Sequence, residues 1–195
     1  MLYAKFIENF LTEEECSDII NIGLKTDIKR LTSVKRTGKN TYEDTRNEDK
    51  LHKRSGSYIE SADIKNIEVL NNVATRTVEL LNKLQPMKNS TYISVPKFTF
   101  NEYVGGDYLN YHYDMHEIEF GATVTVIYQL NDDYDDGFVT YKFSEKGEDH
   151  KVPKKTGSIF IFDSTLLHAV TELKGGKRYS MNSWPTFRIL KKSLV

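Results

Sequence analysis

Three residues of this sequence could bind one metal ion: His112, Asp114 and, much later in the chain, His168. His112 and Asp114 are two residues apart, so on extended backbone both side chains project from the same face of a strand. Two neutral imidazoles and one carboxylate can occupy one face of Fe(II), Mn(II), Co(II) or Zn(II) and leave the opposite positions free for reactants. The pattern therefore predicts a metal centre, with His168 brought in from a different strand.

Other metal arrangements fit the histidines less well. A His-x-Asp pair arises often by chance, and each of the three residues could also be an ordinary core, turn or surface residue. His116 lies four residues after His112, as in a helical zinc site, but no second histidine completes an H-E-x-x-H motif. His52 and His150 lie in charged sequence and are predicted to be solvated.

An arginine, Arg178, follows His168 by ten residues. Its planar guanidinium can bind a carboxylate through two parallel hydrogen bonds, which a lysine does less well. Strand alternation sends the neighbouring Lys177 to the face opposite Arg178 and Ser180. One reactant is therefore expected to be an organic acid held by Arg178.

Composition excludes several other classes of protein. The chain has 195 residues, 38% hydrophobic and 28% charged, which suits one ordinary globular domain. Its net charge of −1 argues against a dedicated nucleic-acid binder. The single cysteine, Cys16, excludes an internal disulfide and a cysteine-rich zinc cluster. The opening residues lack the apolar core of a secretion signal, and no apolar run approaches the roughly 20 residues of a membrane span. We expect a cytoplasmic protein without a membrane partner.

The elements that position these residues begin with two helices. Thr12 and Glu15 form a capping box, with Leu11 and Cys16 placed for a hydrophobic staple. The apolar residues that then share a helical face are Cys16, Ile19, Ile20 and Leu24. A second helix is predicted over Asp63–Leu84, whose stripe is Ile67, Leu70, Ala74, Leu81 and Leu84, and Pro86 ends it. Both helices are expected to pack on a sheet.

A polar stretch from Lys29 to Ser57 separates the two helices. A charge-rich run of this kind is usually a solvated loop. Long loops in compact domains are also often functional, which suggests a lid over an active site. Both interpretations remain open at the level of sequence.

From Ser94 onward the pattern changes to short strands rich in β-branched and aromatic residues, separated by polar turns. The predicted strands are Val95–Val104, Ala122–Leu130, Phe138–Phe143, Ser158–Phe162, His168–Leu173 and Arg178–Phe187. Because no dozen-residue helical pattern lies between them, the sheet should be mainly antiparallel, as in a sandwich, jelly roll or barrel.

In this order the segments resemble the 2-oxoglutarate- and Fe(II)-dependent dioxygenases, most closely their prolyl 4-hydroxylase-like branch. The segments that carry the resemblance are Phe10–Cys16, Tyr103–Gly106 with Tyr111–Asp114, Val152–Gly157 and Gly157–Ser180. The resemblance implies a double-stranded β-helix (jelly-roll) core over 94–190. It also implies an N-terminal part over 1–90 whose helices pack on one sheet, within one domain over 1–195.

The resemblance also assigns roles to individual residues. His112, Asp114 and His168 would bind Fe(II), and Arg178 would bind the distal carboxylate of 2-oxoglutarate, at a position where this branch often has lysine. The residues expected around the cosubstrate are Tyr103, Ser180, Thr125, Ile127 and Gln129, with Trp184 close to the site. Ascorbate is a further candidate cofactor.

The activity implied is hydroxylation of a substrate C–H bond with release of succinate and CO2, and a prolyl residue in a peptide or protein is the expected target. The segment 29–57 would help to recognise that substrate. The alternatives are the same chemistry on a free amino acid, another side chain or a nucleobase, and an inactive jelly-roll binding module. Near-neutral charge disfavours nucleic acid, and the four intact site residues count against a module without chemistry.

Overall fold

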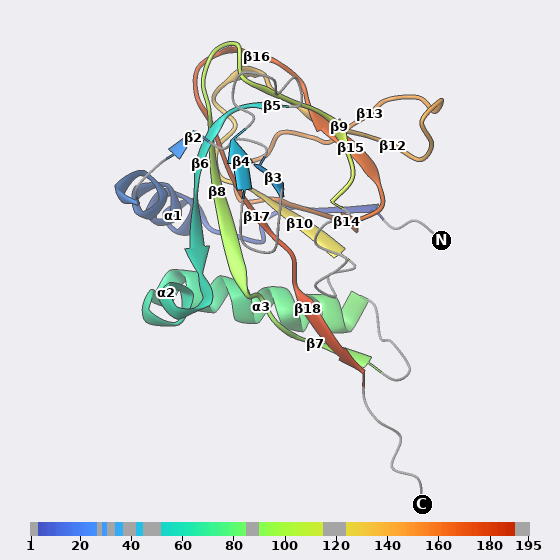
Figure 1. The fold of residues 1–195 in the computed structure, drawn as a ribbon. Helices are drawn as coiled ribbons and strands as arrows, with labels where there is room; N and C mark the ends of the chain where they lie inside the picture. Colours follow the sequence, from blue (N-terminus) through green and yellow to red (C-terminus); the bar gives the residue numbers. More distant parts are fainter. Residues whose placement is uncertain are drawn as a thin grey trace, which may run out of the picture.

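Two antiparallel β-sheets lie face to face, and helices cover the outer side of the larger one (Figure 1). The structure is a computed structural model that describes residues 4–26, 29–30, 34–36, 42–44, 52–84, 90–114 and 124–189. In chain order the elements are β1 (Ala4–Ile7), α1 (Glu13–Lys25), β2 (Lys29–Arg30), β3 (Val34–Arg36), β4 (Tyr42–Asp44), β5 (His52–Lys53), β6 (Ser55–Glu60), α2 (Ser61–Asn66), α3 (Glu68–Leu84), β7 (Ser90–Ser94), β8 (Lys97–Tyr103), β9 (Tyr108–His112), β10 (Val124–Gln129), β11 (Asp135–Asp136), β12 (Val139–Lys142), β13 (His150–Lys151), β14 (Ile159–Asp163), β15 (Leu167–Val170), β16 (Leu173–Gly175), β17 (Arg178–Ser183) and β18 (Thr186–Ile189).

The larger sheet has the strand order β1-β14-β10-β17-β8-β6-β2, and the smaller sheet has the order β13-β12-β15-β9-β5. In both sheets, many neighbouring strands are far apart in sequence, so the chain crosses between strands that are not consecutive. This connectivity is expected of a jelly roll rather than of a simple meander. The prediction of a mainly β jelly-roll core with N-terminal helices on one sheet is confirmed.

The larger sheet separates two hydrophobic cores because alternate side chains of a strand point to opposite faces. On β8, Phe98 and Phe100 are fully buried on the helix side, whereas Tyr103 is buried between the sheets. The helices contribute residues such as Ile19 and Leu70 to the first core. The inner faces of the two sheets form the second core, and this is the face on which the predicted site residues lie.

The N-terminal helix begins as the sequence predicts. The Thr12 hydroxyl accepts from the backbone amide of Glu15 at 3.1 Å, and the Glu15 carboxylate accepts from the amide of Thr12 at 2.9 Å. The predicted buried face is wrong at Leu24, which is 42% exposed. Gly23 lies against the sheet instead, so close to the Phe100 ring that a Cβ there would come within 2.4 Å of it.

Several predicted boundaries change where tertiary contacts decide them. The helix predicted over Asp63–Leu84 is two helices, α2 and α3, separated at Ile67. The strand predicted over Arg178–Phe187 is also two strands, which join different sheets on either side of Trp184 and Pro185. Similarly, the strand predicted over His168–Leu173 divides into β15 and β16.

The prediction of a loop over Lys29–Ser57 is wrong for the part of that stretch that is described. β6 joins the larger sheet beside β8, β2 pairs with β6, and β5 joins the smaller sheet beside β9. The remaining described strands of the stretch, β3 and β4, pair with each other. The intervening residues, and with them a test of the lid interpretation, lie outside the described part of the chain, as does His116.

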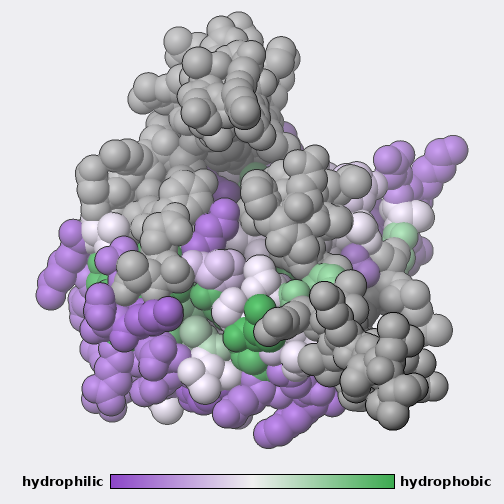
Figure 2. Space-filling model, turned by 60° about the horizontal axis from the view of Figure 1, so that its bottom comes forward, coloured by the Kyte–Doolittle hydropathy of each residue, from purple (hydrophilic) through white to green (hydrophobic). Residues whose placement is uncertain are grey.

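On the α3 and β7 side, the coloured residues of Figure 2 are mostly hydrophilic, with a small hydrophobic area near the middle of the view. Within the described ranges, the exposed large hydrophobic side chains are scattered over different elements: Leu24, Ile93, Val104, Tyr113 and Phe143. No helix among the described residues is long and apolar enough to cross a membrane.

Candidate active site

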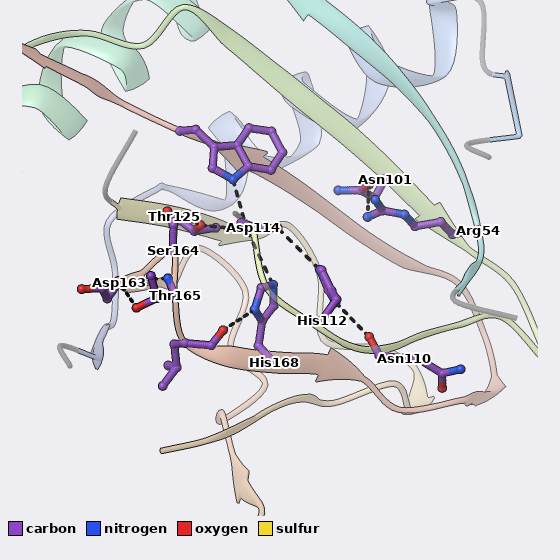
Figure 3. A network of polar contacts seen from close by, with 12 residues as sticks. Arg54, Asn101, Asn110, His112, Asp114, Thr125, Asp163, Ser164, Thr165 and His168 are labelled. Atoms are coloured by element: carbon purple, nitrogen blue, oxygen red, sulfur yellow. Dashed lines mark hydrogen bonds and ion pairs between the residues drawn. The ribbon is translucent and has the colours of Figure 1, made fainter. Parts of the chain in front are cut away.

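The predicted metal ligands meet at one place on the inner face of the smaller sheet (Figure 3). β9 and β15 are neighbours in that sheet, and His112 lies directly opposite His168. Asp114 follows β9, and its backbone amide donates to the carbonyl of Ser164 at 3.0 Å. One ligand atom from each of His112, Asp114 and His168 lies within 4.8 Å of the others.

Both histidine rings are oriented by their own backbone. Nδ1 of His112 lies 2.8 Å from the carbonyl oxygen of Asn110, and Nδ1 of His168 lies 2.9 Å from that of Leu166. Because a carbonyl oxygen only accepts hydrogen bonds, Nδ1 of each ring carries the proton. This leaves Nε2 as the ligand atom of each ring in its neutral form, and the two Nε2 atoms lie 3.5 Å and 3.6 Å from the Asp114 carboxylate oxygens.

The Asp114 carboxylate is buried and held by two hydrogen-bond donors from the larger sheet and its extension. The Thr125 hydroxyl donates to Oδ2 at 2.8 Å, and the Trp184 indole N–H donates to the same atom at 3.1 Å. Burial alone would raise the pKa of Asp114, but the charge interactions and hydrogen bonds with His168, His112 and Thr125 outweigh it and hold the pKa below its usual range. Asp114 is therefore ionised at neutral pH.

His168 is more deeply buried than His112. Burial lowers the pKa of His168 to about 4, against the opposing attraction of Asp114, and Arg54 is among the positive charges that lower it further. The ring is therefore neutral at neutral pH, as a metal ligand must be.

This donor set fits a divalent transition metal. Two imidazole Nε2 atoms and one carboxylate lie close together, and each ligand is oriented by a further hydrogen bond, as is usual for metal-binding histidines and carboxylates. Among the described residues, no fourth histidine, cysteine or acidic side chain joins this group.

Arg178 is buried between the sheets at the start of β17, with 1% of its surface exposed. Its guanidinium carbon lies 4.9 Å from the centre of the Tyr103 ring, and Nη1 donates to the Ser180 hydroxyl at 2.9 Å. Its other nitrogens, Nε and Nη2, are buried without a hydrogen-bond partner.

The unpaired nitrogens of Arg178 indicate which chemical group can bind beside it. Nε and Nη2 lie on one edge of the guanidinium, the edge that binds both oxygens of a carboxylate. A buried charge without a partner is strongly unfavourable, so this edge fits a carboxylate group of a ligand. Lys177 has 57% of its side chain exposed and pairs with Glu102 on the outer face, so it does not reach the site.

The remaining predicted residues divide by what they contact. Tyr103 and Ser180 contact Arg178, as described above. The Gln129 amide donates to the hydroxyl of Tyr134, and the charge of Arg178 opposes the burial that raises the pKa of Tyr134. Thr125 supports Asp114, whereas Ile127 packs in the core between the sheets.

Sequence reasoning missed several polar residues that face the same space: Tyr134, Arg54, Asn101 and Asn182. Asn101 and Asn182 were detectable as polar residues at inward positions of β8 and β17, the strands that also carry Tyr103 and Arg178. Arg54 was one of many charged residues in the polar stretch, and only the pairing of β6 with β8 brings it to the site.

Comparison with known proteins agrees with this geometry. The family model of the 2OG-Fe(II) oxygenase superfamily matches residues 98–186. No curated protein sequence matches the chain.

Solved structures share the fold at low sequence identity. A prolyl-4-hydroxylase from Pseudomonas putida has a TM-score of 0.69 and 15% identity over 94% of this chain and 91% of its own. A prolyl hydroxylase from Trichoplax adhaerens, in complex with a hypoxia-inducible factor peptide fragment, has a TM-score of 0.67 and 18% identity over 94% and 83%. OsALKBH1 has a TM-score of 0.62 and 15% identity over 93% and 97%.

The matched segment contains His112, Asp114, His168 and Arg178, and the fold around it is the one shared by these enzymes. The segment 98–186 is therefore similar in sequence to the 2OG-Fe(II) oxygenase superfamily, and the chain shares the fold of these solved structures.

Proposed function

We propose that this chain is a 2-oxoglutarate- and Fe(II)-dependent dioxygenase that hydroxylates a C–H bond of its substrate and releases succinate and CO2. The observation that carries the proposal is the pairing of two features on the facing sides of the two sheets. One is the group of candidate metal ligands His112, Asp114 and His168. The other is the buried Arg178, whose Nε and Nη2 have no hydrogen-bond partner. We propose that residues 1–195 act as one catalytic domain.

In this proposal the chain's own residues bind and orient the reactants. His112, Asp114 and His168 hold Fe(II), while Arg178 and Ser180 hold the distal carboxylate of 2-oxoglutarate beside Tyr103. Fe(II) with 2-oxoglutarate and dioxygen supplies the oxidising chemistry. Thr125 and Trp184 keep the Asp114 carboxylate in place, and burial between the sheets keeps water from the bound reactants.

The proposed substrate is a prolyl residue in a peptide or protein, and support for it comes from fold similarity to enzymes named as prolyl hydroxylases, one of them in complex with a peptide. The segment 29–57 is proposed to contribute to substrate recognition. Fold similarity extends to OsALKBH1, which is not named as a prolyl hydroxylase, so free amino acids and nucleobases belong in the same test.

Succinate formation tests the chemistry. The intact protein, supplied with Fe(II), 2-oxoglutarate and ascorbate, is expected to bind 2-oxoglutarate and release succinate, and Asp114→Ala is expected to do neither at a measurable rate. Glu172→Ala, which removes an exposed carboxylate paired with Lys174, is the matched control and should behave like the intact protein. Failure of the intact protein to bind Fe(II) or 2-oxoglutarate would refute the proposal.

Mass spectrometry tests the substrate. Proline-containing peptides incubated with the loaded enzyme should gain the mass of one oxygen atom, and fragmentation should place that oxygen on proline. Oxygen on a different residue, a free amino acid or a nucleobase would keep the chemistry and reject the prolyl assignment.

A further inference from the structure

Besides Arg178, the inner face of the larger sheet is reached by Arg54, which lies between β5 and β6 (Figure 3). Its Nη1 donates to Oδ1 of Asn101 at 2.7 Å and to the Tyr103 hydroxyl at 3.3 Å. Asn101 and Tyr103 alternate along β8 on the side that faces the smaller sheet. Arg54 therefore places a second positive charge at the proposed active site.

Among the described residues, no contact of Arg54 neutralises this charge. Its described hydrogen-bond partners are an amide and a phenol, and no described carboxylate forms an ion pair with it. Its Nε is buried without a hydrogen-bond partner. Arg178 has two such nitrogens and Arg54 has one, and an anion would provide the missing hydrogen-bond acceptor.

Two further unpaired atoms extend along the same face. Oγ1 of Thr99 and Oδ1 of Asn182 are both buried without a partner, and the two residues lie directly opposite each other on β8 and β17. Lys97, at the beginning of β8, places its ammonium 5.3 Å from the Trp184 ring, which in turn contacts Asp114. The strip from Arg54 to Trp184 is thus polar, with a basic side chain at each end and the unpaired oxygen atoms of Thr99 and Asn182 between them.

We propose that Arg54 binds an acidic group of the substrate, so that the substrate carries a carboxylate close to the carbon that is oxidised, while Thr99 and Asn182 bind its neighbouring polar atoms. This inference rests on the function proposed above. It narrows the substrate to a free amino acid, a peptide C-terminus or a peptide with an acidic residue beside the target.

The cosubstrate does not account for Arg54. The two guanidiniums lie at different parts of Tyr103, Arg178 against the ring and Arg54 at the hydroxyl. Arg178 has its own unpaired edge for the distal carboxylate, and the metal takes the other end of 2-oxoglutarate in the proposed mode of binding. A nucleic-acid backbone would call for a longer row of cations than this strip contains, and the chain's net charge is −1.

The test compares matched acids and amides as ligands of the enzyme loaded with Fe(II) and 2-oxoglutarate under anaerobic conditions, by calorimetry. The probes are an acetylated peptide ending in proline as free acid and as amide, one with proline followed by Asp or by Asn, and each free amino acid with its amide. The variants are Arg54→Gln, Arg54→Lys as a charge-retaining variant, and Lys177→Gln as a control that removes an outward positive charge.

We expect at least one acid to bind about 10- to 100-fold more tightly than its amide, the range for a hydrogen bond between charged groups. Arg54→Gln should abolish this preference without changing affinity for the amide or for 2-oxoglutarate, Arg54→Lys should retain part of it, and Lys177→Gln all of it. Equal binding of acid and amide throughout the panel, or a preference that survives in Arg54→Gln, would overturn the proposal.

Two other outcomes are distinguishable. If Arg54→Gln weakens 2-oxoglutarate binding as much as Arg178→Gln does, Arg54 belongs to the cosubstrate site and the inference is wrong. If the intact protein does not bind 2-oxoglutarate at all, the proposed function itself fails before any substrate is added.

Discussion

At the scale of single residues, the candidate metal centre depends on donors that do not touch the metal. Asp114 accepts hydrogen bonds at one carboxylate oxygen from Thr125 and Trp184, which come from separate parts of the chain. These bonds leave the second oxygen directed at the His112 imidazole. The orientation of the carboxylate is thus set by the larger sheet, although Asp114 itself follows a strand of the smaller one.

Thr125→Val tests this support, because valine keeps the shape and removes the donor. We expect affinity for Fe(II), or for Co(II) as a spectroscopic substitute, to fall about 10- to 100-fold, as is typical when a partner of a metal ligand is removed. Thr77→Val is the control, since Thr77 is equally buried and bonds to the Tyr128 hydroxyl in the other core. A metal titration that shows equal affinity in both variants would contradict the prediction.

Arg178→Gln removes the charge and the unpaired edge of the guanidinium. With Mn(II) in place of Fe(II), we expect 2-oxoglutarate to bind about 10- to 100-fold more weakly, since hydrogen bonds to charged groups are worth about 1.5–3 kcal/mol. Lys177→Gln should bind 2-oxoglutarate like the intact protein, because Lys177 points outward. A larger effect from Lys177 than from Arg178 would mean that the anchor has been assigned to the wrong residue.

At the scale of elements, the link between β1 and α1 is held at its end by one glycine. The carbonyl of Gly157 accepts from the amides of Phe10 and Leu11, each at 2.9 Å, and its own amide donates to the Gln129 carbonyl. Gly157 has a φ of 78°, and a Cβ there would lie 2.3 Å from the Leu11 carbonyl oxygen. The entry to α1 and the end of β10 therefore meet at a position that excludes a side chain.

Gly157→Ala should destabilise the fold by about 1–3 kcal/mol or more, from backbone strain and the contact with Leu11. Gly105→Ala should change stability by less than about 0.5 kcal/mol, because its Cβ would meet no atom closer than 3.9 Å. Denaturant unfolding of the two variants measures the difference. Equal midpoints would show that the segment before α1 moves aside without cost.

How far the sequence predicted these elements depends on how local their causes are. The capping box and the alternation that sends Arg178 inward and Lys177 outward depend on neighbouring residues, and both were predictable. The break at Trp184 and Pro185 was not, because it depends on which sheet each half of the segment joins. Arg54 was missed for the same reason, since only the register of β6 against β8 gives it a role.

At the scale of the whole molecule, α1 covers the larger sheet through Cys16, which is 1% exposed. Burial raises the pKa of the Cys16 thiol to about 11. With this pKa, only about one thiol in a thousand would be ionised at pH 8, and burial also hinders the approach of a reagent. Its thiolate is thus both rare and shielded in the folded protein.

We therefore expect Cys16 to react with a thiol reagent at pH 8 only when the helix layer separates from the sheet, and to react at once in denaturant. Because its folded pKa lies above the usual value of about 9, stability from the neutral thiol is complete below that value and is lost as pH rises towards 11. Rapid modification of the native protein at pH 8 would show that α1 opens far more often than this core implies.

The two faces of the larger sheet also carry residues that are under different constraints. Along β8, residues 98 and 100 pack against the helices, whereas residues 99, 101 and 103 face the proposed reactants. Adjacent positions of one strand thus have different tasks: one set stabilises the fold, and the other belongs to the proposed substrate site. Substitutions at residues 99, 101 and 103 can therefore change substrate specificity during evolution. Residues 98 and 100, and the helices that pack on them, can stay unchanged.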